Sequence, residues 1–210
     1  MVIYTREQIS AEVIKISSDM GSAFFLRTVF LSLVKPEEIQ EGAEFSDEKE
    51  DEILDAGLTY AVEVKAEDYL SRAEQCRFAL SQKLLKKGYE KKHIDKALDY
   101  LEQKNFLNDV RFSVSWLNSR KISHFEGRTK LLSELLARGI SKNNAQKALE
   151  EFFEEISEYE LCEKCLEKIM RTSGSSSKPL DREKIIQKML NNGFSWSMVK
   201  EVLSNFDGNN

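Results

Sequence analysis

The sequence predicts a mainly α-helical protein: three tandem three-helix repeats forming an elongated curved rod, with a small β-containing extension at the N-terminus. Three observations predict this class. Only two prolines and nine glycines occur in 210 residues, so long helices are permitted almost throughout. Charged residues make 32% and hydrophobic residues 41%, which suits small cores between stacked helices. One apolar pattern recurs around Gly88, Gly139 and Gly193, which lie 51 and 54 residues apart.

Residues 1–57 differ from the rest of the chain and are predicted to form the extension. Apolar residues at 13–16 and an aromatic, β-branched run at 23–34 flank a turn-like stretch, which predicts a short β-hairpin or small sheet. Ser46, followed by acidic residues, predicts the start of a helix, because a side-chain acceptor and early carboxylates satisfy free N–H groups there. Gly57 is expected to end that helix.

From residue 58 onward the signal is helical and repeats. Apolar residues stand eight, four and three positions before each of the three glycines, on one helical face. Each glycine is expected to end that helix with a positive φ. A second helix follows, with apolar residues six, nine, ten and thirteen positions after the glycine, and another amphipathic segment precedes each pair. The predicted repeats span 58–105, 106–155 and 156–210, with a Ser-rich loop at 173–179 in the third.

Charge is unevenly distributed along the chain, although the net charge is only −5. Residues 1–60 hold 5 basic and 13 acidic residues, residues 61–147 hold 18 and 11, and residues 148–210 hold 8 and 12. The successive net charges are therefore −8, +7 and −4. A basic middle favours a polyanion or an acidic protein surface as partner, although a solvated helix face gives the same pattern.

No residue pattern indicates catalysis, a cofactor or a metal. Cys162 and Cys165 form a single Cys-x-x-Cys, and zinc would need two further ligands that no second pair supplies, so we expect buried or idle thiols. His93 and His124 belong to no motif, and no phosphate loop or nucleophile elbow occurs. No apolar run reaches the ~20 residues of a membrane-spanning helix, and no export signal is visible. We therefore expect a cytoplasmic, monomeric, non-enzymatic protein without a cofactor or membrane contact.

The segment 105–122, NFLNDVRFSVSWLNSRKI, resembles the signature of the RecX family of recombination regulators. The matching positions are Leu107, Asp109, Arg111, Phe112, Trp116 and Arg120. Asn108 and Ser113 depart from the family's aspartate and alanine, but neither change removes a cap or the core face. Segments 71–89 and 127–141 resemble neighbouring family helices. The likeness covers about 58–206 and is weakest in the third repeat.

The resemblance implies a protein that binds the RecA recombinase filament on single-stranded DNA. Family members modulate, and mostly inhibit, ATP hydrolysis, strand exchange and filament extension in DNA repair, homologous recombination and the SOS response. A curved basic rod could contact several subunits at once and gain avidity. Phe112 and Trp116 are expected to be scaffold, since aromatic residues spaced four apart on a helix are usually core. Our candidates for the binding face are Arg111, Arg120, Lys121, Arg128, Lys130 and Arg138.

Each candidate also has a structural alternative, such as an ion pair between Arg111 and Asp109. Two other functions stay open. Tandem helix-turn-helix-like units could bind DNA directly through the basic block, with an affinity that falls steeply with salt; weak direct DNA contact is also compatible with a filament regulator. An enzyme such as a nuclease would need clustered carboxylates or a nucleophile–base pair, and neither is visible. The acidic extension could be a partner-specific module or a cover over the basic middle.

Overall fold

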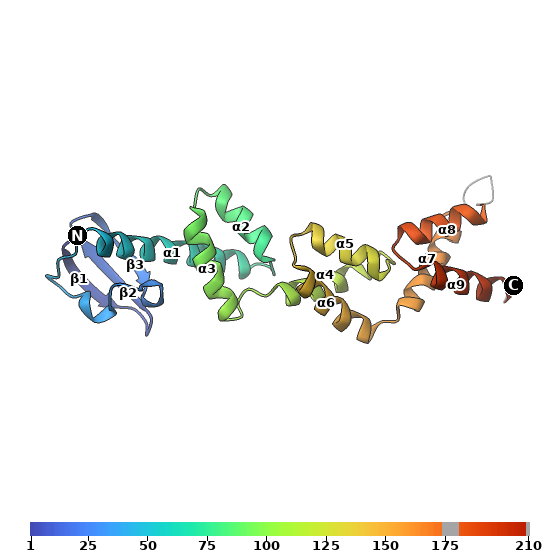
Figure 1. Cartoon of the computed structure of the whole chain (residues 1–210), viewed down its shortest axis with the longest axis horizontal. Coiled ribbons are helices and arrows are strands. Elements are labelled where there is room, and N and C mark those ends of the chain that lie inside the picture. The colour runs from blue at the N-terminus through green and yellow to red at the C-terminus, as the bar shows by residue number, and fades with distance from the viewer. Residues whose placement is uncertain (174–180, 209–210) are drawn as a thin grey trace. The chain divides into compact units, whose positions relative to one another are not determined.

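The computed structural model describes residues 1–173 and 181–208 (Figure 1). These residues form two compact units, one ending at Leu107 and the other beginning at Asn108. The protein is mainly helical, and a small three-stranded sheet stands at its N-terminal end, so the predicted class is confirmed at this level. The predicted Ser-rich loop lies, apart from its first residue, outside the described residues.

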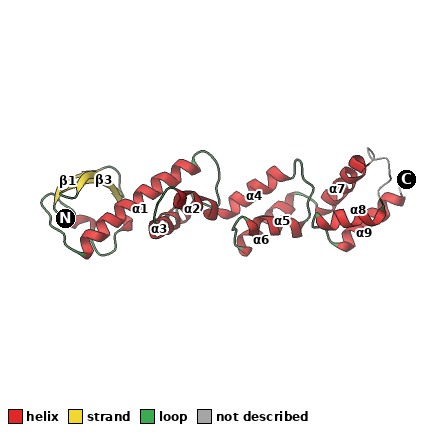
Figure 2. Cartoon of the chain, turned by 90° about the horizontal axis from the view of Figure 1, so that it is seen from above, coloured by secondary structure: helices red, strands yellow, loops and turns green. Residues whose placement is uncertain are grey.

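The sheet of the first unit is antiparallel with the strand order β1-β2-β3. Figure 2 shows its strands in yellow. Its strands are β1 (Ile3–Gln8), β2 (Val13–Ser18) and β3 (Gly21–Arg27). The β2–β3 hairpin confirms the expected β-structure. β1 is not predicted by the sequence pattern, because only Ile3 of that strand is buried and the rest is polar or exposed.

Helix α1 (Glu48–Leu70) runs without interruption through Gly57, so the predicted helix end at this glycine is wrong. A Cβ at Gly57 would lie 2.6 Å from Cδ2 of Phe24, so the absent side chain allows β3 to pack closely on the helix. The acidic first turn is confirmed, but the N-cap position is Asp47 rather than Ser46.

The sheet and the first helices share one hydrophobic core. α1 packs on β3 and on α3 (Lys91–Gln103), and α2 (Arg77–Lys86) packs on both helices. Arg27 of β3 forms a bidentate ion pair with the fully buried Glu63 of α1 and donates to Glu12 at 3.0 Å. The hydroxyl of Tyr100 on α3 also donates to Glu12, at 2.9 Å. The predicted boundary at residue 57 therefore falls inside a helix and inside one core; the further division into repeats stays a prediction.

The second unit contains six helices in its described residues. They are α4 (Asp109–Arg120), α5 (Arg128–Ala137), α6 (Lys142–Glu155), α7 (Glu158–Ser173), α8 (Arg182–Asn191) and α9 (Trp196–Gly208). α4 packs on α6, α5 packs on α6, and α7 packs on both α8 and α9.

The three aligned glycines end α2, α5 and α8 with φ values of +89°, +80° and +87°, as predicted. The apolar positions eight and four residues before them are buried in all three helices. The position three residues before the glycine shares this face only in part, because Leu85 is 38% exposed and Leu136 is 42% exposed, whereas Leu190 is half-buried. It lies to one side of the stripe that faces the following helix.

The two departures from the family signature are accommodated in α4. Asn108 caps this helix, since its side-chain oxygen accepts hydrogen bonds from the backbone N–H groups of Val110 and Arg111 at 2.9 and 3.0 Å. Ser113 is fully buried on the core face, and its hydroxyl donates to the carbonyl of Asp109 at 2.6 Å. The hydroxyl is therefore satisfied where the family has alanine.

Candidate partner-binding surface

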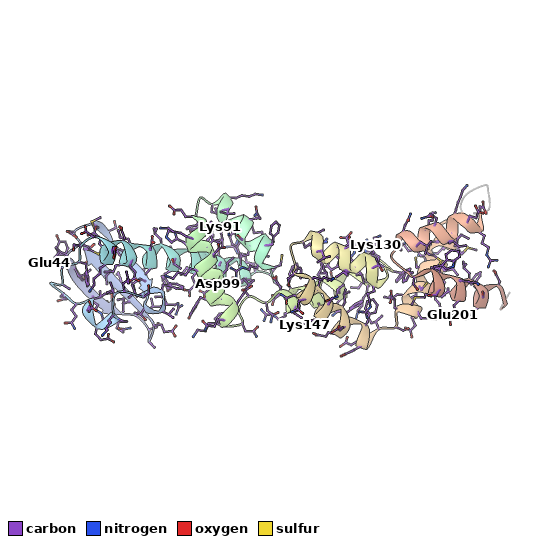
Figure 3. The ribbon with its side chains drawn as sticks, in the orientation of Figure 1. Glu44, Lys91, Asp99, Lys130, Lys147 and Glu201 are labelled. Carbon is purple, nitrogen blue, oxygen red and sulfur yellow. The ribbon has the colours of Figure 1, made fainter. Side chains whose placement is uncertain are left out.

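The densest basic segment of the sequence forms α4, α5 and the loop between them, and Figure 3 labels Lys130 on α5. The six candidate residues differ in whether a carboxylate of the same unit pairs with their positive charge. Arg120, Lys130 and Arg138 form ion pairs with carboxylates of the same unit. Their positive charge is therefore partly compensated inside the fold.

Glu126, in the loop before α5, is the centre of the first ion-pair cluster. Its side chain is only 4% exposed, and Arg120 holds it with Nε at 2.6 Å and Nη2 at 3.0 Å. Lys130 Nζ lies 2.8 Å from the same carboxylate. Burial raises the pKa of Glu126, but the hydrogen bonds from Arg120 and Lys130 outweigh it, and the pKa lies below its ordinary value. Glu126 is therefore a buried anion that needs both cations.

Trp116 joins Arg120 to Arg138. The two guanidinium groups lie 5.2 and 4.3 Å from the centre of the indole ring, and Arg138 also pairs with Glu134 at 2.8 Å. Cations over an indole face are attracted by its negative quadrupole. Trp116 is half-buried and organises this cluster, so it is not the core residue that its spacing from Phe112 predicts, and Phe112 is half-buried as well.

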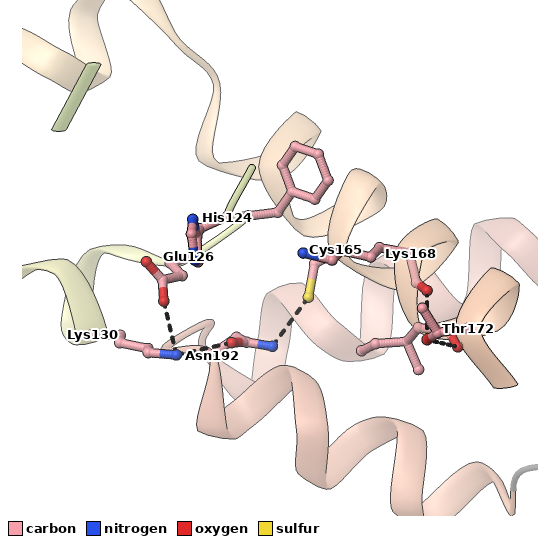
Figure 4. Close-up of a pocket in the computed structure, with 9 residues that line it drawn as sticks. His124, Glu126, Lys130, Cys165, Lys168, Thr172 and Asn192 are labelled. Atoms are coloured by element: carbon pink, nitrogen blue, oxygen red, sulfur yellow. Dashed lines mark hydrogen bonds and ion pairs between the residues drawn. The ribbon is translucent and has the colours of Figure 1, made fainter. Parts of the chain in front are cut away.

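A polar chain continues from Glu126 into the last three helices (Figure 4). Lys130 Nζ donates to Oδ1 of Asn192, the residue after α8, at 3.1 Å. The amide nitrogen of Asn192 lies 3.4 Å from Sγ of Cys165 on α7. A hollow of about 200 Å³ lies beside this chain, and His124 and Lys168 also line it. Lys130 is therefore a link between α5 and α8 rather than a free cation.

Gly127 and Gly193 bring the same helices into close backbone contact. The N–H of Gly127 donates to the carbonyl of Asn192 at 2.8 Å. A Cβ at Gly127 would lie 2.5 Å from the carbonyl oxygen of Gly193, and a Cβ at Gly193 would lie 2.5 Å from Cβ of Lys130. Neither position has room for a side chain. Gly193 thus has two roles, the positive-φ helix end and this contact, of which the sequence analysis found only the first.

Arg128, the first residue of α5, is exposed, and its guanidinium lies 4.6 Å from the centre of the Phe153 ring on α6. Its backbone N–H donates to Glu158 at 2.7 Å, but among the described residues its side chain forms no ion pair. Stacking on an aromatic ring keeps a guanidinium in place while its N–H groups stay free to donate. Arg128 is therefore the candidate best placed to bind an external anion.

Arg128 has counterparts in the other two glycine-ended helix pairs, and these are not among the predicted site residues. An arginine stands eleven positions before each glycine, and the residue it meets stands fourteen positions after it. The three pairs are Arg77 with Glu102 at 2.7 Å, Arg128 over Phe153, and Arg182 with Asp207 at 2.7 Å. The signal was readable from the glycine alignment. Only the middle pair puts an aromatic ring where the others have a carboxylate.

The remaining candidates are Arg111 and Lys121. Arg111 lies half-buried on α4, interacts within the structure, and lines a shallow hollow with Asn118 and Glu151. Lys121 is the C-cap residue of α4, and its ammonium group has no ion pair among the described residues. The next residue, Ile122, is 79% exposed. Lys121, which is half-buried, thus stands beside an exposed apolar side chain.

The cysteines are buried thiols rather than an open site. Burial raises the pKa of Cys162 to about 12 and also raises that of Cys165. In the part of the chain that the structure covers, no three His, Cys, Asp or Glu side chains gather as metal ligands would. Among the described helices, none combines the length and apolar character that crossing a membrane requires.

Comparison with known proteins gives a consistent result. A family profile described as "RecX, first three-helix domain" matches residues 64–101. The chain is 33% identical over 163 residues to the regulatory protein RecX of Treponema pallidum strain Nichols, covering 78% of this chain and 96% of that protein. It is 31% identical over 137 residues to the regulatory protein RecX of Chlorobium limicola, covering 64% of this chain and 82% of the relative.

Solved structures share the fold. A crystal structure of a regulatory protein RecX matches with a TM-score of 0.74 at 21% sequence identity, covering 97% of this chain and 98% of that one. The structure of RecX from Lactobacillus salivarius matches with a TM-score of 0.61 and covers 71% of this chain. Both likenesses concern the fold.

Proposed function

We propose a function from one established premise: the chain belongs to the RecX family of regulatory proteins. On our proposal it is a cytoplasmic, monomeric and non-enzymatic protein that binds the RecA recombinase filament on single-stranded DNA. It restrains ATP hydrolysis, strand exchange and filament extension. The observation that carries the proposal is the 33% identity to a regulatory protein RecX over 96% of that protein's length. An alignment of that extent concerns a whole protein, whereas a shared helix pair alone would be common to many folds.

We further propose that the helices form three tandem three-helix repeats arranged as a curved rod. The support is internal to the chain: three helix pairs turn at a positive-φ glycine, and each follows another helix. A rod of this kind can contact several filament subunits, and linked weak contacts add through effective concentration. The affinity for a filament would then greatly exceed that for a single subunit.

We place the principal filament contact at Arg128, with Lys121 beside the same loop. The guanidinium of Arg128 is exposed and held by Phe153, so it can meet a carboxylate or phosphate with two parallel hydrogen bonds. On this proposal Arg120, Lys130 and Arg138 stabilise the fold of this surface through their ion pairs with Glu126 and Glu134. Arg111 contributes from the α4 side. The division of roles follows from which charges are compensated inside the unit.

The same division argues against direct DNA binding as the main activity. Affinity for bare DNA depends on how many basic groups reach phosphates, and the salt dependence of binding counts them. Because Arg120, Lys130 and Arg138 already pair with Glu126 and Glu134, the surface offers fewer free cations than the sequence suggests. We therefore expect weak contact with bare DNA and a shallow dependence on salt.

The test is ATP hydrolysis by the cognate recombinase on single-stranded DNA while this protein is titrated in. Bare-DNA binding is followed in parallel at two salt concentrations. We expect loss of hydrolysis at substoichiometric protein without comparable bare-DNA affinity. No change in hydrolysis, together with tight salt-sensitive DNA binding, would overturn the proposal in favour of a DNA-binding protein.

Two matched variants then locate the contact. Arg128→Gln and Arg77→Gln remove the same charge at the same position of two helix pairs. We expect Arg128→Gln to weaken inhibition about tenfold or more, since a hydrogen bond to a charged group contributes about 1.5–3 kcal/mol. Arg77→Gln should inhibit like the wild type, because Arg77 already pairs with Asp99 and Glu102. Equal loss in both variants would mean that bulk charge, not Arg128, mediates binding.

A further inference from the structure

The groove between α8 and α9 is an apolar hollow with an exposed tryptophan at its edge. It has a volume of about 200 Å³. Its lining residues are Arg182, Ile186, Trp196, Val199, Lys200 and Leu203. The side chain of Trp196 is 58% exposed, although burial of an indole is strongly favourable. An accessible tryptophan beside an apolar hollow is typical of a binding hot spot.

The equivalent positions of α2 and α3 hold ion-paired side chains. Lys91 stands where α9 has Trp196, and it pairs with Asp95 at 2.7 Å. Asp95 stands where α9 has Lys200. Arg77 crosses the same groove and pairs with Asp99 at 2.7 Å. At these positions the first helix pair therefore carries surface ion pairs in place of an exposed aromatic side chain.

The middle helix pair is also polar at these positions. Lys142 stands where α9 has Trp196, and Gln146 stands where it has Lys200. The last helix pair therefore differs from both others by an aromatic side chain in place of lysine. It also has a lysine where the others have aspartate and glutamine. Figure 3 labels Lys147 on α6 and Glu201 on α9, a further equivalent position at which the sign of the charge changes.

The charge around the groove favours an acidic occupant of low total charge. No carboxylate lines the hollow, and the ammonium group of Lys200 has no partner among the described residues. Arg182 pairs with Asp207 at 2.7 Å but is still 61% exposed. Residues 181–207 hold four basic and four acidic side chains, so their net charge is zero. A polyanion would find little attraction here, whereas one carboxylate beside Lys200 would be favourable.

We propose that the α8–α9 groove docks a short acidic peptide segment of a partner protein. The segment inserts one aromatic or aliphatic side chain against Trp196, above Val199 and Leu203, and places a carboxylate at Lys200. This surface is separate from the basic middle and goes beyond the function proposed above, because it requires no nucleoprotein filament. It gives the protein a second recognition point, specific for a peptide motif rather than for a charged surface.

The experiment selects random short peptides, displayed on phage, on the full chain. The matched counter-selection uses Trp196→Lys, which installs the residue that both other helix pairs carry at an exposed position. We expect enriched peptides with an aromatic residue or leucine flanked by aspartate or glutamate. Synthetic versions of these peptides should lose roughly tenfold or more in affinity for Trp196→Lys, the size of a hot-spot effect. Circular dichroism verifies that the variant keeps its fold.

A second variant tests the charge. Lys200→Asp, the residue at the equivalent position of α3, should weaken the acidic peptides and leave versions with asparagine and glutamine in place of the acids unaffected. No enrichment that depends on Trp196, or enriched peptides without acidic residues, would overturn the proposal. A short oligothymidylate is titrated in parallel. If it binds in a manner that Trp196→Lys abolishes and the peptides do not bind, the groove recognises nucleic acid instead.

Discussion

Replacing Gly127 with alanine tests the close backbone contact that holds α5 against the end of α8. Gly127 has a φ of −81°, which any residue adopts, so alanine meets no backbone strain. Its Cβ would, however, lie 2.5 Å from the carbonyl oxygen of Gly193. Relief of that overlap requires the helices to separate and strains the hydrogen bond from the Gly127 N–H to Asn192 at 2.8 Å. Overpacking of this kind destabilises by about 1–3 kcal/mol.

Two further glycines serve as matched controls. Gly88 has a φ of +89°, and nothing lies within 4 Å of the Cβ that alanine would add, so Gly88→Ala measures the backbone strain alone, about 1–2 kcal/mol. Gly193 combines a φ of +87° with the steric overlap against Lys130. We expect Gly193→Ala to destabilise by the sum of both effects, about 2–5 kcal/mol.

The assay is urea unfolding followed by two signals. Both tryptophans, Trp116 and Trp196, belong to the second unit, so their fluorescence reports that unit, while far-ultraviolet circular dichroism reports the whole chain. Gly127→Ala and Gly193→Ala should lower the midpoint of the fluorescence transition, and Gly88→Ala should change only the dichroism. If Gly127→Ala leaves the fluorescence midpoint within error of the wild type, the contact between the two glycines does not exist in solution.

The remaining predictions concern buried polar groups. Glu126→Leu leaves Arg120 and Lys130 without their buried partner and should cost about 3–5 kcal/mol in the fluorescence transition, whereas an unaffected midpoint would make Glu126 dispensable. The pKa of Glu126 is lowered in the fold, so its ionised form stabilises the folded state. This contribution to the free energy of unfolding is complete above the ordinary pKa of about 4.3 and is lost as the pH falls through the lower folded pKa. In Glu126→Gln, the free energy of unfolding should not show this loss in acid. With a pKa of about 12, Cys162 should react with a thiol reagent at neutral pH only after urea unfolding, and rapid native labelling would contradict its burial.

The ends of α2, α5 and α8 could be predicted because each depends on the backbone conformation of a single glycine. A positive φ after a helix is a local demand that glycine meets at little cost, and all three aligned glycines show it. Gly57 was misread because the same residue type also serves close packing: it lies inside α1, where Phe24 needs the space. Nothing local distinguishes the two uses, because the second depends on a strand more than thirty residues earlier in the chain.

For the candidate surface, too, the sequence shows where the charged residues stand but not which of them pair with one another. The sequence located the basic segment, but it could not show that Arg120 and Lys130 enclose Glu126, since that arrangement depends on how a loop folds back between two helices. The difference between Arg128 and its counterparts could have been predicted, because Arg77 and Arg182 stand at the same distance before their glycines. The sequence also holds the residues fourteen positions past each glycine, but only the structure shows that Glu102, Phe153 and Asp207 contact these arginines.

The pairing of Arg128 with Phe153 suggests how duplicated segments diverge. Where copies of a helix pair descend from one ancestor, a carboxylate at the partner position is the state kept by two copies here, as Glu102 and Asp207. A change to phenylalanine in the middle copy removes one surface ion pair, which contributes only about 0.2–1 kcal/mol. The arginine stays anchored but becomes available to another molecule. After duplication, one copy can thus acquire a new contact while the other two copies keep the arginine–carboxylate ion pair.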